Sequence, residues 1–238
     1  MKRITLVLSL AVVTPSAFAD CPRPEGVQDR GIAGQSDQQR LDYLSALASR
    51  EVSHISTWKL LSGGAFAGLV VGQLAIAPLF EPSVRPDYYW GAGYSALGLV
   101  STLVGAPAVF EHGTEFAAHA AAATPETVCT VIAEGEALIA KSAADEVLPT
   151  RWFIHALNVA VNLSLGAILG FGYGHWTNAT INTLAGIAIS ETVLFTKPHA
   201  SIAGWREYTT GGDQPVSLQL RVSPTLSGGL TVGLGGTF

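Results

Sequence analysis

The stretch Trp152–Ser190, WFIHALNVAVNLSLGAILGFGYGHWTNATINTLAGIAIS, contains no Asp, Glu, Lys or Arg. Two shorter stretches, residues 60–80 and 88–110, also lack charged side chains. A helix of roughly 20 mainly apolar residues, rising about 1.5 Å per residue, is long enough to cross the hydrocarbon core of a bilayer. These stretches predict a mainly α-helical protein, a polytopic membrane bundle of about four spans.

The composition agrees with that fold class. Apolar residues make up 48% of the 238 residues and charged residues only 13%, whereas a soluble domain has about 25% charged residues. The net charge is −5 and the chain has no run of basic residues. Nucleic-acid binding is therefore not expected, and no Lys/Arg cluster for anionic lipid is present.

The first 19 residues have the pattern of a secretory signal peptide. Lys2 and Arg3 precede an apolar core, and Ala17-Phe18-Ala19 matches a cleavage site. The mature chain is then expected to begin at Asp20, outside the cytoplasm. The two cysteines, Cys21 and Cys129, can form one disulfide in such an oxidising compartment, and two free thiols are the alternative.

Charge, periodicity and turn residues divide the chain into six segments. Ser36 and Gln39 fit a capping box at the start of an amphipathic helix, and alternation after residue 215 predicts a β-hairpin with Trp205–Thr209 as an added third strand. The expected segments are a signal peptide (1–19), an exported segment with the amphipathic helix (20–57), a first pair of spans (58–110), a periplasmic helical interlude (111–150), a second pair of spans (151–197) and a C-terminal β-hairpin tail (198–238).

A cleaved signal peptide followed by four spans places both termini and the interlude in the periplasm. The inner membrane is favoured on this reading. The positive-inside rule disagrees, because the expected inner loops carry only Arg85. We favour the orientation that the signal peptide sets, since the opposite one leaves that peptide without a role.

Small residues recur at every fourth position in three of the spans, a pattern typical of closely packed membrane helices. The alternative is that glycine is simply common in such helices. We expect these stripes to be contact faces, within one chain or between chains. They consist of Gly64, Gly68 and Gly72 in the first span, Gly166, Gly170 and Gly174 in the third, and Asn182, Gly186 and Ser190 in the fourth.

Polar residues in the last two spans are the main candidate site. His155, Asn158 and Asn162 form one stripe on the third span, and Glu191 is the one formal charge in its region of the fourth. An ionisable group inside a membrane is a candidate functional residue. The alternative, which we favour, is hydrogen bonding between helices, with Asn178, Asn182 or Thr183 as partners.

A second candidate site follows the second span. His112, Glu115 and His119 share one face of a continuous helix, and imidazole with carboxylate suits zinc or iron. The spacing is not HExxH, so a wetted helix end is the simpler interpretation. The chain also lacks GxSxG, a P-loop and GxGxxG, so no catalytic set and no cofactor are expected.

These observations favour a non-enzymatic protein of a bacterial-type cell envelope, with a structural or interaction role. Its expected partners are the lipid bilayer and an envelope protein or further copies of itself. The alternative is a small-solute transporter or membrane-embedded enzyme that uses His155, Asn158, Asn162 and Glu191.

Two other architectures are weaker alternatives. The last ten residues, which end in Phe238, resemble the final strand of outer-membrane β-barrels, and this keeps the outer membrane as an alternative location. A complete barrel needs about eight such strands, and the middle of the chain has contiguous apolar runs instead. A soluble, very hydrophobic helical bundle is the other alternative.

Overall fold

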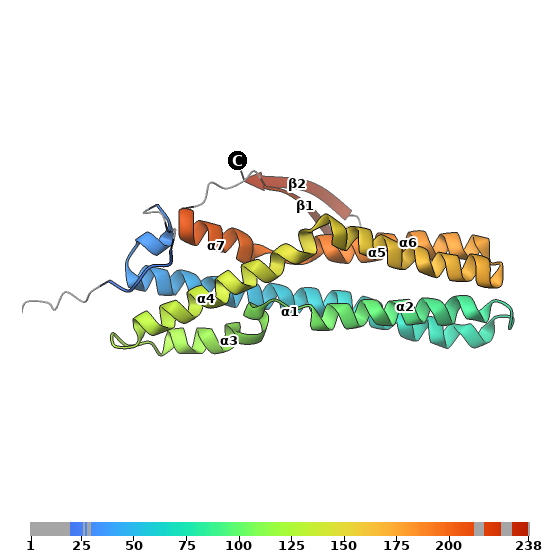
Figure 1. The fold of residues 1–238 in the computed structure, drawn as a ribbon, viewed down its shortest axis with the longest axis horizontal. Helices are drawn as coiled ribbons and strands as arrows, with labels where there is room; N and C mark the ends of the chain where they lie inside the picture. Colours follow the sequence, from blue (N-terminus) through green and yellow to red (C-terminus); the bar gives the residue numbers. More distant parts are fainter. Residues whose placement is uncertain (1–19, 26, 28–29, 212–216, 225–229, 238) are drawn as a thin grey trace, which may run out of the picture.

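The protein is described from a computed structural model, which covers residues 20–25, 27, 30–211, 217–224 and 230–237. The predicted signal peptide, the turn 225–229 and the terminal Phe238 lie outside these described residues. Figure 1 shows an elongated molecule made of two long helical hairpins and a group of helices at one end. The helices are α1 (Asp37–Ile76), α2 (Arg85–Val104), α3 (Ala108–Ala121), α4 (Val128–Val147), α5 (Trp152–Ala167), α6 (Trp176–Thr196) and α7 (Ala200–Thr210).

Helix α1 connects the two halves of the molecule. It begins at the predicted capping box, in which the Ser36 side chain accepts a bond from the Gln39 backbone N–H and the Gln39 side chain accepts one from the Ser36 backbone N–H. The helix continues for 40 residues, about 60 Å at the standard rise. It runs without a break through Ser62-Gly63-Gly64.

Four segments of the described chain are helical, long and apolar enough to cross a membrane. They are Asp37–Leu79, Arg85–Ala121, Trp152–Gly172 and Trp176–Thr210. At most 28% of the residues in any of their apolar windows are buried inside the protein. The expectation of a mainly helical protein with four such helices is confirmed. We call α1 from Trp58 onward, α2, α5 and α6 the spanning bundle.

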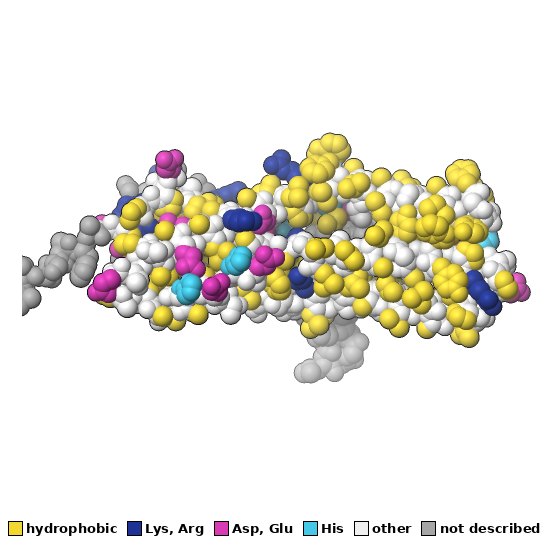
Figure 2. All heavy atoms as spheres, turned by 60° about the horizontal axis from the view of Figure 1, so that its bottom comes forward, with side chains coloured by type: hydrophobic (Ala, Val, Ile, Leu, Met, Phe, Trp, Pro, Cys, Tyr) yellow, Lys and Arg dark blue, Asp and Glu magenta, His cyan; other side chains and the backbone are white. Residues whose placement is uncertain are grey.

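Hydrophobic side chains cover the surface of the spanning bundle, whereas charged side chains gather mainly at the other end (Figure 2). Leu61, Val104 and Phe171, for example, are 68%, 75% and 81% exposed. In water such a surface would be unfavourable by about 25 cal/mol for each Å² of apolar area. This surface is what a lipid-facing bundle requires.

The predicted second span, 88–110, extends too far. Helix α2 ends at Val104, and α3 begins at Ala108, one residue after Pro107. Proline disfavours helical geometry in the residue before it, so the chain turns here. It turns into what we call the head, made of residues 20–57, 108–150 and 200–210.

The head has its own apolar core, formed by α1, α3, α4 and α7. Its three parts come from separate stretches of sequence, yet they lie at the same end of the spanning bundle (Figure 1). The core side chains include Leu44, Leu47, Val109, Phe116, Ile132, Ile139 and Tyr208.

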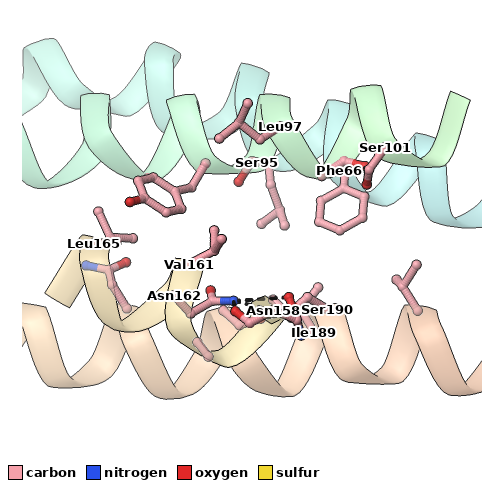
Figure 3. Close-up of a pocket in the computed structure, with 18 of the residues that line it drawn as sticks. Phe66, Ser95, Leu97, Ser101, Asn158, Val161, Asn162, Leu165, Ile189 and Ser190 are labelled. Atoms are coloured by element: carbon pink, nitrogen blue, oxygen red, sulfur yellow. Dashed lines mark hydrogen bonds between the residues drawn. The ribbon is translucent and has the colours of Figure 1, made fainter. Parts of the chain in front are cut away.

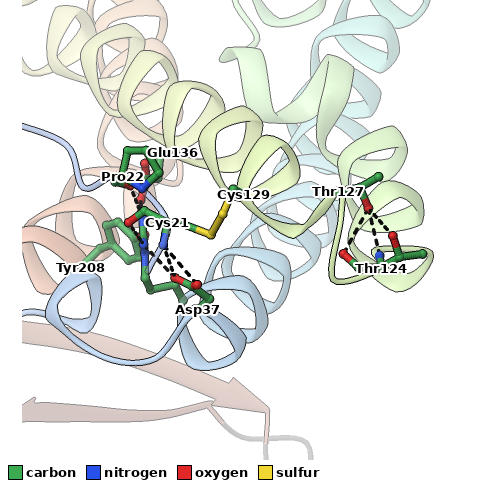
Figure 4. Close-up of a disulfide and its surroundings, with 9 residues drawn as sticks. Cys21, Pro22, Asp37, Thr124, Thr127, Cys129, Glu136 and Tyr208 are labelled. Carbon is green, nitrogen blue, oxygen red and sulfur yellow. Dashed lines mark hydrogen bonds and ion pairs between the residues drawn. A yellow bond between two sulfur atoms is a disulfide. The ribbon is translucent and has the colours of Figure 1, made fainter. Parts of the chain in front are cut away.

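A fully buried arginine joins four parts of the head. The Arg40 guanidinium lies 2.7 Å from Glu136 and donates to the Tyr208 hydroxyl at 3.2 Å. It also donates to the backbone carbonyls of Cys21 and Pro22 (Figure 4). A buried charge is tolerated only when it is paired and hydrogen-bonded. Arg40 therefore fixes the N-terminal segment against α1, α4 and α7.

The predicted third strand, Trp205–Thr209, is wrong, because these residues belong to α7. Ser201, Gly204 and Tyr208 are the buried residues of that helix, and their spacing is helical rather than alternating. A Cβ on Gly204 would meet the Leu47 side chain. Close packing on α1 therefore determines the helical form of this segment.

Beyond α7, the structure draws two antiparallel strands, β1 (Ser217–Pro224) and β2 (Leu230–Thr237). Their register pairs residue 217 with residue 237 and residue 224 with residue 230. The connecting turn lies outside the described residues, so the hairpin stays a prediction.

Cys21 and Cys129, the two cysteines of the chain, are joined in a disulfide. Because the cysteines are 108 residues apart, losing this bond frees a large loop in the unfolded chain. We predict that the double variant Cys21→Ser/Cys129→Ser is less stable by about 2–4 kcal/mol. Thermal unfolding in mild detergent measures the change. A reductant should lower the melting temperature of the unmodified protein and leave the variant unaffected, and an unchanged melting temperature in both would contradict the prediction.

Candidate functional site

The predicted polar stripe of α5 faces Glu191 of α6. The His155 Nδ1 atom lies 2.6 Å from the Glu191 Oε2 atom, and the Asn158 side-chain amide donates to Oε1 at 2.7 Å. The sequence prediction placed Glu191 in the same candidate site as the stripe, but it gave the stripe other hydrogen-bond partners. The structure instead brings it together with His155 and Asn158.

Asn162 extends this network deeper into the bundle. Its amide donates to the Asn158 backbone carbonyl at 2.9 Å and to the Ser190 hydroxyl at 3.3 Å. The Thr183 hydroxyl donates to the Asn162 backbone carbonyl at 3.4 Å. Of the three partners expected from sequence, Thr183 alone contacts the stripe. On α6, the Glu191 carboxylate contacts His155 and accepts from Asn158.

A second cluster of the same composition lies at the opposite end of the bundle. Asp87, which is buried, lies 2.7 Å from the His175 Nδ1 atom and accepts a hydrogen bond of 2.5 Å from the Asn178 side chain. Asn182 is separate, because it donates to the Asn178 backbone carbonyl. The sequence analysis did not name Asp87 and His175 as candidate residues. Each lies next to one of the two short turns expected at the same membrane surface, and this shared position could have indicated that they meet.

The two clusters perform different structural tasks. Glu191, His155 and Asn158 link α5 to α6, the two helices of one hairpin. Asp87, His175 and Asn178 link α2 to the start of α6, and so join the two hairpins. Hydrogen bonds to a carboxylate are about twice as strong as neutral ones, which suits such links in a low-dielectric interior.

The predicted glycine stripes differ in whether they contact another part of the chain. A Cβ on Gly166 would meet the Thr183 side chain, and one on Gly170 would meet Trp176. Gly174 instead forms the turn before α6, with a φ of 73° that favours glycine. In the first span, nothing lies within 4 Å of a Cβ built on Gly64, Gly68 or Gly72. Within the described residues, the Cα atoms of that stripe therefore face open space, and contact between chains stays a prediction.

Gly186 of the predicted stripe in the fourth span, and two glycines outside the predicted stripes, also pack closely. A Cβ on Gly98 would meet Phe66, and one on Gly91 would meet Gln73. Gly186, between Asn182 and Ser190 in sequence, gives room to the Asn162 side chain. Close approach is therefore needed on α2 and α6, where single glycines face bulky side chains.

A cavity of about 530 Å³ separates the hairpin α1–α2 from the hairpin α5–α6. Figure 3 shows side chains from both hairpins pointing into it. Asn158, Asn162 and Ser190 line one wall, among apolar side chains such as Leu157 and Val161. The polar stripe therefore borders a partly open space between the two hairpins.

The predicted metal set is divided between different neighbours. His112 lies 4.0 Å from Glu111, and His119 lies 3.0 Å from Glu134 on α4. In the part of the chain that the structure describes, the group close enough to hold a metal is Cys21, Asp37 and Cys129. Both cysteines of that group are in the disulfide, so it does not offer free thiolates.

The head contains two buried acidic side chains that sequence analysis missed. Glu51 is 0% exposed and Glu146 is 1% exposed. Both Glu51 oxygens, Glu146 Oε1 and the Ser201 hydroxyl have no hydrogen-bond partner in the described chain. Glu51 follows Leu44 and Leu47 at helical spacing and precedes Ile55. Its position on this apolar face of the helix could have indicated from sequence that Glu51 is buried.

Burial is the main cause that raises the pKa of Glu146 to about 7, and the nearby charge of Glu51 also raises it, against the hydrogen bond that the Ile202 backbone N–H donates to Oε2 at 3.2 Å. The arrangement holds a proton near neutral pH.

His155 and Glu191 form a closed pair. In the described part of the chain, their side-chain hydrogen bonds run to each other and to Asn158, and the His155 ring stacks on Phe195 at 5.0 Å. These contacts connect α5 to α6.

We predict that Glu191→Leu destabilises the bundle, because His155 and Asn158 lose their acceptor. The expected cost is about 1–2 kcal/mol, seen as a lower melting temperature in detergent. Thr192→Leu is the matched control, since Thr192 is exposed and bonds to its own helix. Equal melting temperatures for both variants would contradict a linking role.

We also predict that the stability of the head falls as the pH rises. Since the folded-state pKa of Glu146 exceeds its ordinary value of 4.5, its stabilising contribution is complete below about pH 4.5 and lost as the pH passes about 7. The loss is about 3 kcal/mol. Glu146→Gln should flatten the dependence of the melting temperature between pH 5 and 8. Glu115→Gln, at an exposed position, should keep it, and a slope retained in both variants would refute the assignment.

Comparisons with protein-family models, with curated proteins and with solved structures each find no match to this chain. A functional assignment therefore depends on the geometry described above.

Proposed function

We propose that this chain is a non-enzymatic protein of the cell envelope, in which the spanning bundle anchors the head so that the head contacts a partner. The observation that carries the proposal is the head itself. Three separate stretches of sequence meet at one end of the bundle and share an apolar core. An anchor alone does not need such a structure.

The internal connections of the head support a binding role. The disulfide attaches the N-terminal segment to α4, and Arg40 attaches it to α1, α4 and α7. A surface held rigid in this way loses little conformational entropy when it binds. The head is therefore suited to present a preformed surface.

The surface of the head is also distinct in chemistry. Acidic and histidine side chains gather on the face formed by α3 and α4 (Figure 2). Glu111, Glu115 and Glu134 belong to this face, which we take as the contact surface. Its charge favours a partner with basic side chains.

The proposed location is the inner membrane, with the head and both termini in the periplasm after removal of residues 1–19. A disulfide in the head suits that oxidising compartment. The C-terminal hairpin, if formed there, is available on the same side.

The alternative is a transporter or membrane-embedded enzyme that uses His155, Asn158, Asn162 and Glu191. On that alternative, Glu191→Leu and His155→Ala abolish an activity at unchanged protein level. On our proposal they lower stability and abundance, because these side chains serve as links between helices.

Site-specific photo-crosslinking in intact cells tests the proposal. We predict that a photoreactive residue at position 115 of the head yields a discrete adduct with a partner or with another copy of the chain. The matched control is position 81, which is exposed at the opposite end of the bundle. Adducts from position 81 alone would contradict the proposal, as would a solitary monomer after purification in mild detergent.

A further inference from the structure

The two hairpins are fixed to each other at both ends of the bundle. At the turn end, Asp87 binds His175 and Asn178, and the Trp90 indole N–H donates to the Tyr173 hydroxyl at 3.2 Å. At the head end, Lys197 donates to the Gly105 carbonyl at 2.7 Å. Between these ends, the cavity of about 530 Å³ separates the hairpins.

The cavity lies at the depth of the hydrocarbon core. Asp87 and Gly105 mark the two fixed ends, and the helix between them is about 27 Å long at the standard rise. The hydrocarbon core of a bilayer is about 30 Å thick. The space between the hairpins therefore faces lipid chains rather than water.

The walls have the chemistry of a site for an amphiphile. Phe66, Leu69, Leu97, Leu157 and Val161 supply apolar surface from both hairpins. The volume falls within the roughly 300 to 1,000 Å³ of pockets that hold small ligands. An empty space of this size within a bundle loses the dispersion contacts of its walls.

One polar atom on the wall lacks a partner. The Gln73 Oε1 atom is buried and accepts no hydrogen bond in the described chain, although Gln73 lines the cavity. An unsatisfied amide in hydrocarbon costs several kcal/mol. Gln73 lies one turn before the end of α1 at Ile76, close to the membrane surface on the side of the turns. A donor at that depth belongs to the headgroup region of a lipid. It reaches the oxygen when the Gln73 side chain turns away from Gly91, against which the oxygen packs.

We propose that the cavity binds one membrane lipid from the leaflet on the side of the turns. Its hydrocarbon chain occupies the space between the hairpins, and the Gln73 side chain turns from Gly91 towards the headgroup, whose hydroxyl or ammonium group donates to Oε1. The lipid supplies the packing that the hairpins do not supply to each other. This binding goes beyond the proposed contact of the head with a partner.

The first test fills the cavity from α6. Ala185 is exposed and lines the cavity, whereas Ala188 is exposed on the same helix and does not line it. We predict that the unmodified protein, purified in mild detergent, keeps about one lipid per chain in native mass spectrometry. Ala185→Trp should lower the retained lipid at least tenfold and Ala188→Trp should leave it unchanged. Equal retention by the two variants overturns the proposal.

The second test uses the unmodified protein, so it does not depend on how a variant folds. The protein is placed in phosphatidylethanolamine–phosphatidylglycerol vesicles with a trace of phosphatidylethanolamine that carries a diazirine on one chain. Crosslinks should concentrate severalfold in the cavity-lining parts of residues 91–101 and 185–194. An even spread over the outer surface, or a dimer that fills the space without lipid, overturns the proposal. Gln73→Leu should weaken lipid retention several-fold, and unchanged retention refutes the role of Gln73.

Discussion

The arrangement of the spanning bundle depends on one constraint, which is that hydrocarbon offers no hydrogen bonds. Each polar side chain at that depth must find a partner on another helix or on its own backbone. Glu191 is matched by His155 and Asn158, and Asp87 by His175 and Asn178. These matches set which helices are neighbours and where along their lengths they meet. Under the same constraint, the unpartnered oxygen of Gln73 supports the proposal that a lipid headgroup supplies the missing donor.

The head follows the opposite rule, because water surrounds it. Its apolar side chains turn inward to form a core, and most of its charges lie outside. The few buried charges have particular consequences: Arg40 is fully paired, whereas Glu51 and Glu146 retain oxygens without hydrogen-bond partners. Helix α1 passes through both environments, and its residues change from an amphipathic to an almost wholly apolar pattern near Trp58.

Much of the fold could be predicted from the sequence. The long uncharged stretches predict four membrane-length helices, and Ser36 with Gln39 predicts the start of α1. The candidate site was predicted in part, since His155, Asn158, Asn162 and Glu191 were named while Asp87, His175, Gln73, Glu51 and Glu146 were not. The missed residues share a property: the pairing or the burial of each depends on elements far away in sequence. The glycine stripe of the first span shows the reverse error, because local spacing does not say which face of a helix meets another helix.

The sequence by itself determined which surroundings, lipid or water, suit each segment. A helix without charged residues can remain in lipid, whereas an amphipathic helix with charged residues on one side cannot. Local signals also set where several helices begin and end. Tertiary structure alone decided the pairing of the polar groups, the helical form of residues 200–210 and the cavity between the hairpins. The physical reason is that burial, hydrogen-bond matching and empty volume are properties of two or more elements together, and no single stretch of sequence contains them.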